Sequence, residues 1–269
     1  MTFYLISYHM PFLKSFPTAL LLAATVLAAA PARAQQPTDA AAAKKAADEA
    51  YHQRQEYLLH NDWPNLQKYA AANQRLPAPR PGRPRVVIIG NSITEGWVKE
   101  DSAFFRGKTY EYVGRGISGQ ASGQTVLRFR PDVIDLHPAV VVLLVGTNDV
   151  AENNGPYNPQ TTMNNLMSMC ELARAHGIRV VLGAVAPSTD FWWRKGLDPA
   201  PKILALNQRI KAYANQQHFA YYDLHTALKN DQNGLKKAYG EDGVHPNLAG
   251  YRVMEPLLNQ AVAAALKRK

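Results

Sequence analysis

From Arg85 to the end of the chain, apolar runs suited to buried strands alternate with stretches suited to amphipathic helices. This alternation limits the possible folds more than any other feature of the sequence. We expect strands at 85–90, 110–114, 139–146, 178–185 and 220–224, and helices after Ser92, near 122–130, at 159–176, at 200–217 and from Asn247. Strict alternation implies right-handed crossovers, so the pattern predicts an α/β fold with a parallel sheet and helices on both faces.

The first 34 residues are typical of a signal peptide and not of the folded domain. Lys14 precedes the apolar run ALLLAATVLAAA at 19–30, and Ala32 and Ala34 supply the small residues of a cleavage site. The run is short for a membrane span. We therefore predict cleavage near Ala34 and export to the periplasm or beyond, with no integral membrane segment in the mature chain.

Residues 35–84 form a predicted leader ahead of the domain at 85–269. The leader is rich in alanine and favours helix, and Asp62 and Pro64 give the start signal of a second helix. The segment PAPRPGRPR at 77–85 is typical of an extended connector. We expect the leader to pack on the outside of the domain.

Charge and cysteine content narrow the function classes. The chain carries a formal net charge of +9, but its basic residues are scattered, as in RFRPD and the terminal KRK, without the stripe of a nucleic-acid surface. We interpret them as solvated and expect no nucleic-acid partner. The single cysteine, Cys170, excludes an internal disulfide and cannot anchor a lipid after the signal. Its place on an apolar helix face favours buried packing over a nucleophilic role.

The segments that follow the predicted strands carry the polar residues. They read GNS (90–92), GRGISGQ (114–120), GTND (146–149), APSTDFWW (186–193) and EDGVHPN (241–247). In a parallel sheet the carboxyl ends of the strands meet at one edge, where ligands bind. Glycine, asparagine and serine are also ordinary turn formers, so no single segment is decisive. Their order along one edge is what indicates a site.

The residue types at this edge fit acyl transfer. A serine hydroxyl becomes a nucleophile when a base takes its proton and an acid orients that base. Ser92, His245 and Asp242 supply these three groups. The reaction also builds negative charge on a carbonyl oxygen, and preorganised hydrogen-bond donors must stabilise this charge. The candidates are the main-chain N–H groups of Ser92 and Gly119 and the side-chain amide of Asn148.

This set of motifs resembles the SGNH, or GDSL-like, hydrolase family over roughly residues 85–265. The four blocks are GNSIT, GRGISGQ, GTND and DGVHP. The resemblance implies a flavodoxin-like α/β/α sandwich with a parallel central sheet. It also implies that Ser92 is the nucleophile, that Gly119 and Asn148 complete the oxyanion hole, and that Asp242 and His245 complete the triad. Many members have Asp where this chain has Asn91, and we expect that change to tune the turn without abolishing activity.

Other residues compete for functional roles. His225, two residues after Asp223, is the best rival for the base, although a structural role is favoured. The remaining histidines lack metal-ligand spacing, so we predict no metal and no cofactor. Asp149 is expected to brace its loop. The loop DFWWRKG has two adjacent aromatics, of which one can easily face inward, and we interpret Trp192, Trp193 and Arg194 as a substrate wall.

Together these features favour an exported serine esterase that removes a small acyl group, most simply acetyl, from a carbohydrate or glycan. A lipid or lysophospholipid esterase is the enzymatic alternative. A catalytically silent glycan-binding module on the same fold is the alternative from another class. The intact Ser92, Asp242 and His245 argue against that module.

Overall fold

The computed structural model describes residues 37–268, so the predicted signal peptide lies outside the described residues. The chain divides into two units after Tyr51. Helix α1 (Pro37–Asn61) begins in the first unit and ends in the second. The fold described below is that of the second unit, which runs from His52 to Lys269.

Five parallel strands form the central sheet in the order β2-β1-β3-β4-β5. They are β1 (Arg85–Gly90), β2 (Glu111–Gly116), β3 (Val140–Leu144), β4 (Arg179–Gly183) and β5 (Ala220–Tyr222). This is the flavodoxin-like order, in which the chain direction across the sheet reverses between β1 and β3. The predicted fold class and strand positions are confirmed, and Ser92 follows the strand at the reversal.

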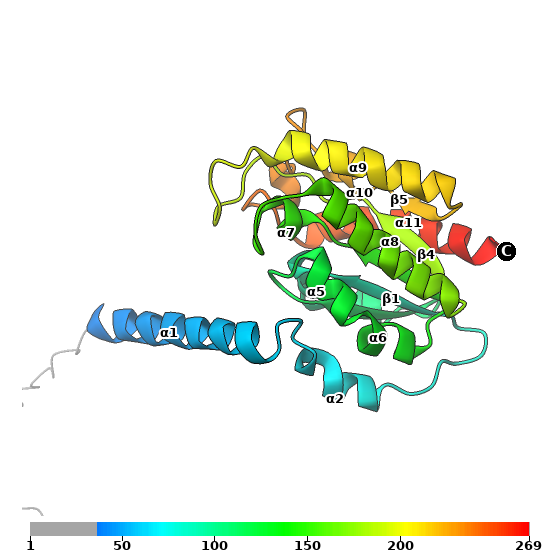
Figure 1. The fold of residues 1–269 in the computed structure, drawn as a ribbon, viewed down its shortest axis with the longest axis horizontal. Coiled ribbons are helices and arrows are strands. Elements are labelled where there is room, and N and C mark those ends of the chain that lie inside the picture. The colour runs from blue at the N-terminus through cyan, green and yellow to red at the C-terminus, as the bar shows by residue number, and fades with distance from the viewer. Residues whose placement is uncertain (1–36, 269) are drawn as a thin grey trace, which may run out of the picture. The chain divides into compact units, whose positions relative to one another are not determined.

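Helices cover both faces of the sheet, as Figure 1 shows for α8 and α9 on one side and α11 on the other. Odd-numbered residues of β1, Val87 and Ile89, pack with α6, α8 and α9, while Val86 and Ile88 pack with α3, α10 and α11. The period of two in a strand produces this division. The helices are α2 (Gln67–Arg75), α3 (Ser92–Glu100), α4 (Ser102–Phe105), α5 (Ser122–Leu127), α6 (Phe129–Asp132), α7 (Thr147–Val150), α8 (Pro159–Ala175), α9 (Pro199–Gln216), α10 (Leu224–Leu228) and α11 (Leu248–Lys267), with 3-10 turns at Ile134–Leu136 and Lys237–Tyr239.

The predicted helix at 122–130 is in fact two short helices, α5 and α6, which meet at Arg128. The Arg128 side chain is fully buried. It donates to Gln120 Oε1 at 2.6 Å, to Arg115 O and Asp132 Oδ2 at 2.9 Å, and to Gly90 O at 2.8 Å. The expectation that the charges of RFRPD are solvated is therefore wrong for Arg128, which joins the ends of β1 and β2 from inside.

One other element differs from the sequence prediction in detail. The second leader helix, α2, begins at Gln67 because Asn65 adopts a positive φ of 54° just before it. Asp62 still stabilises the turn ahead of α2, since its carboxylate accepts from Leu66 N at 2.8 Å and from Gln67 N at 3.2 Å. Cys170 is buried, as predicted from its helix face.

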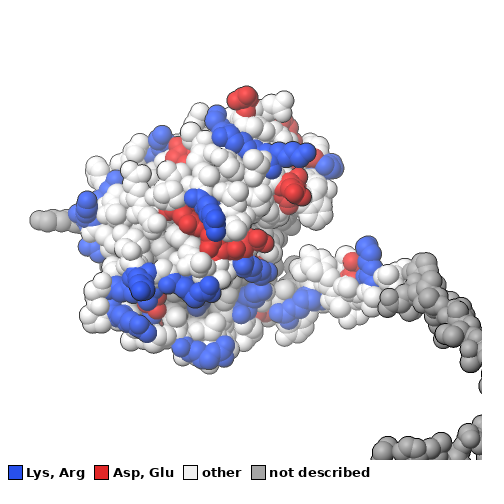
Figure 2. Space-filling model, turned by 180° about the vertical axis from the view of Figure 1, so that it is seen from behind, with Lys and Arg blue, Asp and Glu red and all other residues white. Residues whose placement is uncertain are grey.

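The surface carries both signs of charge. Figure 2 shows Lys and Arg side chains interspersed with Asp and Glu over the face turned toward the viewer. Within residues 37–268, no helix is both long enough and apolar enough to cross a membrane.

Candidate active site

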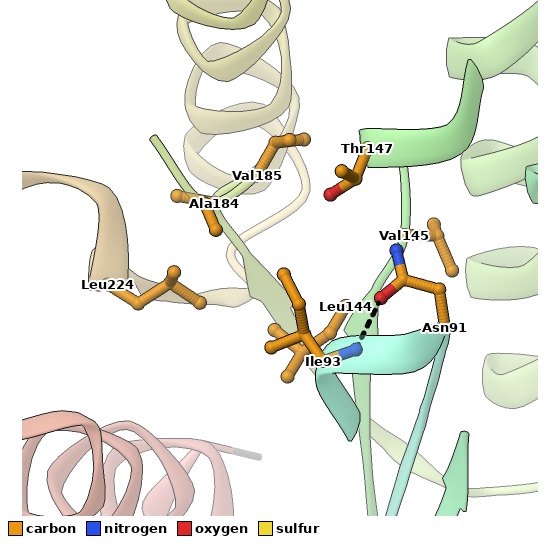
Figure 3. Close-up of a pocket in the computed structure, with 9 residues that line it drawn as sticks. Asn91, Ile93, Leu144, Val145, Thr147, Ala184, Val185 and Leu224 are labelled. Atoms are coloured by element: carbon orange, nitrogen blue, oxygen red, sulfur yellow. Dashed lines mark hydrogen bonds between the residues drawn. The ribbon is translucent and has the colours of Figure 1, made fainter. Parts of the chain in front are cut away.

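Ser92 is the first residue of α3, directly after the buried strand β1. Asn91 forms the N-cap of that helix, and its Oδ1 accepts a hydrogen bond from Ile93 N at 3.0 Å (Figure 3). The cap satisfies one of the free N–H groups of the first helical turn. It therefore fixes the sharp bend on which the half-buried Ser92 hydroxyl is presented.

The loop before α11 brings an acid and a base to this hydroxyl. His245 Nε2 lies 2.8 Å from Ser92 Oγ, and His245 Nδ1 lies 2.6 Å from Asp242 Oδ2. Asp242 Oδ1 also accepts from Val244 N at 2.9 Å and from His245 N at 2.8 Å, so the carboxylate orders its own loop. The three side chains predicted from the sequence thus form one hydrogen-bonded chain.

The hydrogen bonds of this chain keep Asp242 ionised. Burial opposes ionisation of Asp242, but hydrogen bonds from His245 and Val244 outweigh it, and the pKa of Asp242 lies below its usual value. An ionised Asp242 accepts the Nδ1–H of His245, which leaves Nε2 to accept the proton of Ser92. The arrangement can therefore accept the proton of the Ser92 hydroxyl.

The glycine turn and Asn148 lie beside this chain and are joined by hydrogen bonds. Ile117 N donates to Gly90 O at 3.1 Å, which ties the turn after β2 to the end of β1. Gly119 has a φ of +78°, a conformation that favours glycine. Asn148 Nδ2 donates to Gln120 O at 2.9 Å and keeps a second N–H for another acceptor.

Asn153 orients the Asn148 amide, a role that its position in the sequence did not reveal. Its Nδ2 donates to Asn148 Oδ1 at 3.0 Å and to Gly119 O at 3.2 Å. Because Oδ1 of Asn148 is engaged in this way, the Nδ2 side is held toward the turn. Asn153 stands in a run of turn-forming residues, NDVAENNGPYNPQ, where its type alone carries no signal.

Glu95 is a second contributor that the sequence did not reveal. Its Oε2 accepts from both N and Oγ of Ser118 at 2.8 Å, and its Oε1 pairs with Lys68 at 3.1 Å. Burial opposes ionisation of Glu95, but these partners outweigh it and lower its pKa to about 2. The carboxylate therefore fastens the glycine turn to α3. In sequence, a glutamate four residues before Lys99 is compatible with an ordinary exposed helix pair.

The two adjacent tryptophans of the aromatic loop differ in burial, as expected from their adjacency in sequence. Trp193 is half-buried, its ring lies 6.4 Å from the His245 ring at 30°, and its Nε1 donates to Asn153 Oδ1 at 3.0 Å. Trp192 is 62% exposed. Arg194 donates to Glu152 O at 2.7 Å. Trp193 therefore borders the hydrogen-bonded chain of Ser92, His245 and Asp242, whereas Trp192 and Arg194 stand further out on the same loop.

His225 and Asp149, the residues that competed for functional roles, have structural surroundings instead. His225 is buried in α10, and its Nε2 has no hydrogen-bond partner, so it is not the histidine on Ser92. Burial lowers the pKa of His225. Asp149 braces its loop, as predicted, by accepting from Ser122 N at 3.0 Å and from Thr162 Oγ1 at 3.2 Å. Among the residues that the structure describes, no cluster of three or more His, Cys, Asp or Glu side chains could hold a metal ion.

A small pocket lies at the carboxyl ends of β1, β3 and β4, and neither Ser92 nor His245 lines it. Asn91, Ile93, Thr147 and Leu224 line it together with aliphatic side chains from the ends of β3 and β4 (Figure 3). Its volume is about 10 Å³, roughly the space of one water molecule. An acyl chain of several carbons does not fit there.

Comparison with known proteins identifies relatives of the domain. The model of the GDSL-like lipase/acylhydrolase family matches residues 88–253. A solved structure of a GDSL-like lipase from Bacteroides thetaiotaomicron is 45% identical with a TM-score of 0.73, and the match covers 76% of this chain and all of that one. A structure from Bacteroides fragilis is 46% identical with a TM-score of 0.74, covering 77% of this chain and all of that one.

Curated relatives are more distant. The esterase TesA of Pseudomonas aeruginosa is 27% identical over 68% of this chain and 87% of its own length. An acetylxylan esterase of Xylanibacter ruminicola is 25% identical over 71% of this chain and 45% of its own length. An uncharacterized lipoprotein of Bacillus subtilis, YqeF, is 28% identical over 52% of this chain, and the match spans 63% of that relative's length.

Proposed function

Because this chain belongs to the GDSL-like lipase/acylhydrolase family and is an SGNH-type esterase, we propose that it removes acetyl groups from a carbohydrate or glycan by a Ser-His-Asp mechanism. The observation that carries the mechanism is the hydrogen-bonded chain from Asp242 through His245 to Ser92. Each step below follows from the protons and lone pairs of that chain.

In the first half-reaction, Ser92 Oγ attacks the ester carbonyl while His245 Nε2 takes its proton. Asp242 stabilises the imidazolium that forms. The carbonyl oxygen becomes an oxyanion. It accepts hydrogen bonds from the main-chain N–H groups of Ser92 and Gly119 and from the second N–H of Asn148 Nδ2. The intermediate collapses by breaking the bond to the sugar oxygen. His245 gives its proton to that oxygen, so the alcohol leaves and the acyl group stays on Ser92.

The second half-reaction uses water in place of the sugar. His245 Nε2 takes a proton from the water as its oxygen attacks the acyl carbonyl, and the same donors hold the oxyanion. Collapse breaks the bond to Ser92 Oγ, which recovers the proton from His245. Acetic acid leaves as acetate, and the resting hydrogen bonds re-form. The cycle requires no group beyond this chain's residues and water.

The proposed substrate carries a small acyl group. A short acyl group needs little space behind the carbonyl, whereas a fatty chain needs an apolar channel. The acetylxylan esterase among the relatives supports the same substrate class, although the match spans less than half of that protein.

A chain-length series of nitrophenyl esters tests the acyl preference. We expect kcat/KM to fall steeply from acetyl to octanoyl. Equal or rising activity on octanoyl esters would favour the lipid esterase instead. The silent binding module predicts that a fluorophosphonate probe labels neither the wild type nor Ser92→Ala, whereas we expect labelling of the wild type alone.

We also propose that the protein is exported after cleavage near Ala34. The support is the charged, apolar and small-residue order of residues 1–34, together with the lipoprotein among the relatives. Expression of the full chain followed by N-terminal sequencing of the exported product tests this. We expect a product that begins at Gln35, and intracellular accumulation of the uncleaved chain would contradict it.

A further inference from the structure

A second pocket lies on the outer side of the glycine turn. It is formed by Trp63, by residues of α5 and α8, and by the loop at 154–158. Its volume is about 210 Å³. This is below the range of roughly 300–1,000 Å³ that is typical of sites for drug-sized ligands. The pocket therefore suits one small ring of a larger molecule.

Two aromatic side chains stand in the walls of this pocket. Trp63 is 38% exposed, and Tyr157 is half-buried. The segment that carries Trp63 is held in place, since Gln124 Nε2 donates to Trp63 O at 2.9 Å and Gln120 Nε2 donates to Pro64 O at 2.7 Å. An exposed indole that is anchored through its own main chain offers a flat apolar face at low entropic cost.

Three asparagines in the lining each use one end of the amide internally. Asn165 Nδ2 donates to Ser122 Oγ at 2.9 Å, and Asn154 Nδ2 donates to Gln124 Oε1 at 2.6 Å. Asn158 Oδ1 accepts from Gln160 N at 2.9 Å and from Thr161 N at 3.1 Å. These bonds fix the three amides. The opposite ends, Oδ1 of Asn165 and Asn154 and Nδ2 of Asn158, have no partner among the described residues and are available to a ligand.

The charge of the lining restricts the ligand. No Lys or Arg lines the pocket, so a phosphate or a carboxylate finds no counter-ion there. The one acidic residue, Asp149, already accepts hydrogen bonds from N and Oγ of Ser122 and from Thr162, so it does not offer a free carboxylate. Flat aromatic surface with fixed neutral amides matches a neutral polyhydroxylated ring, which has apolar C–H faces and hydroxyls at its rim.

The pocket adjoins the catalytic site along three chain segments. Ala121 in its lining is two residues after Gly119, Asp149 follows Asn148, and Asn154 follows Asn153. Two residues span at most about 7 Å. Residues close in sequence to the proposed oxyanion donors and to Asn153 therefore line this pocket. We propose that the Trp63 pocket binds a neighbouring sugar unit of the glycan whose acyl group lies at Ser92, an inference that rests on the proposed function.

Gly123→Ala provides a selective test. Gly123 lies in helix α5 and lines the pocket, and a Cβ there would lie 3.7 Å from Asn165 Nδ2 and 3.8 Å from Trp63 Cη2. These are ordinary contact distances, so the methyl fills space without a clash. Alanine also favours a helix over glycine. Trp63→Ala removes the aromatic wall instead, and Leu127→Ala, a 54% exposed position on the same helix outside the lining, is the matched control.

The assay compares kcat/KM on acetylated xylotetraose with kcat/KM on acetylated xylose. We expect Gly123→Ala and Trp63→Ala to lower the ratio of these values roughly 10-fold, the effect of losing one well-packed contact, and Leu127→Ala to leave it unchanged. An unchanged ratio in folded Gly123→Ala and Trp63→Ala proteins would overturn the proposal. An equal loss on both substrates would overturn it too, because the pocket would then act through the catalytic residues.

Binding without catalysis separates this proposal from the proposed function. In the Ser92→Ala background, titration with unacetylated xylotetraose, cellotetraose and chitotetraose measures the affinity of the pocket for each sugar directly. We expect at least one of them to bind and Gly123→Ala to weaken it roughly 10-fold. Binding that is equal with and without the added methyl, or no binding of any of the three, would overturn the sugar assignment. Failure of the wild type to release acetate from acetylated sugars would instead refute the proposed function.

Discussion

Asn153→Ala tests whether the oxyanion site depends on a residue that has no part in the triad. The change deletes the donor to Asn148 Oδ1 at 3.0 Å and to Gly119 O at 3.2 Å. Asn148 is 3% exposed, so water does not easily replace the lost donor. The Asn148 amide then keeps only its bond to Gln120 O at 2.9 Å and can turn its oxygen toward the oxyanion.

Two limits bound the size of the effect. Losing one ordinary hydrogen bond costs about 0.5–1.5 kcal/mol, or roughly 2- to 13-fold in rate. Losing an entire oxyanion donor costs about 100- to 1000-fold in kcat. Because Asn153→Ala leaves the Asn148 amide present but loosely held, we expect kcat to fall about 10- to 100-fold. KM should change little, since the donor acts mainly on the charge of the transition state.

A double-mutant cycle on nitrophenyl acetate provides the measurement. If Asn153 acts through Asn148, Asn153→Ala should cost almost nothing in an Asn148→Ala background. Trp193→Phe removes the bond from Trp193 Nε1 to Asn153 Oδ1 but keeps an aromatic ring beside His245, so its kcat should fall only a few-fold. Independent, additive losses from Asn148→Ala and Asn153→Ala would refute the reasoning.

The remaining predictions concern the donors, the base and pH. Asn148→Ala should lower kcat about 100- to 1000-fold at nearly constant KM, and an effect on KM alone would make Asn148 a ground-state contact. His245→Ala should be nearly as inactive as Ser92→Ala, whereas His225→Ala should reduce thermal stability and leave kcat close to the wild-type value; the reverse result would move the base to His225. Glu95 should stabilise the fold by about 1–2 kcal/mol relative to Glu95→Gln, discounted for its partial exposure. Because its folded pKa of about 2 lies below the ordinary 4.5, that difference in unfolding free energy should be complete above pH 4.5 and vanish as the pH falls through 2; a constant difference across this range would contradict it.

The residues that sequence predicts well are those whose role is local. The run Val86–Ile89 identifies a buried central strand because four consecutive apolar β-branched residues have few other stable environments. The loop from Asp242 to His245 is equally local, since the carboxylate bonds to the main chain and ring within three residues. The strand-end rule does not place this loop beside Ser92, because α10 and a 3-10 turn separate it from β5; the resemblance of the motif blocks predicted that pairing.

Residues whose role depends on distant partners were not predictable. Arg128 appeared as one of several scattered charges, yet its guanidinium contacts Gly90 O, 38 positions away in sequence. Glu95 binds Ser118, 23 positions away, and Trp193 binds Asn153, 40 positions away. The type of each residue fits many surroundings, and only the folded chain selects one. Such contacts hold the turns whose motifs the sequence did reveal.

Asn91 shows how a motif residue can change while its local function stays. The side chain is 3% exposed and caps α3 through Oδ1 alone. An aspartate would make the same bond and gain from the helix dipole, but it would also bury a negative charge at the residue before Ser92. Asparagine supplies the acceptor without that charge. The turn geometry therefore persists with Asn at this position, and the electrostatic cost of a neighbouring carboxylate is absent. Comparing wild type with Asn91→Asp across pH separates the two effects, because the cap affects the stability of the fold and the charge affects kcat.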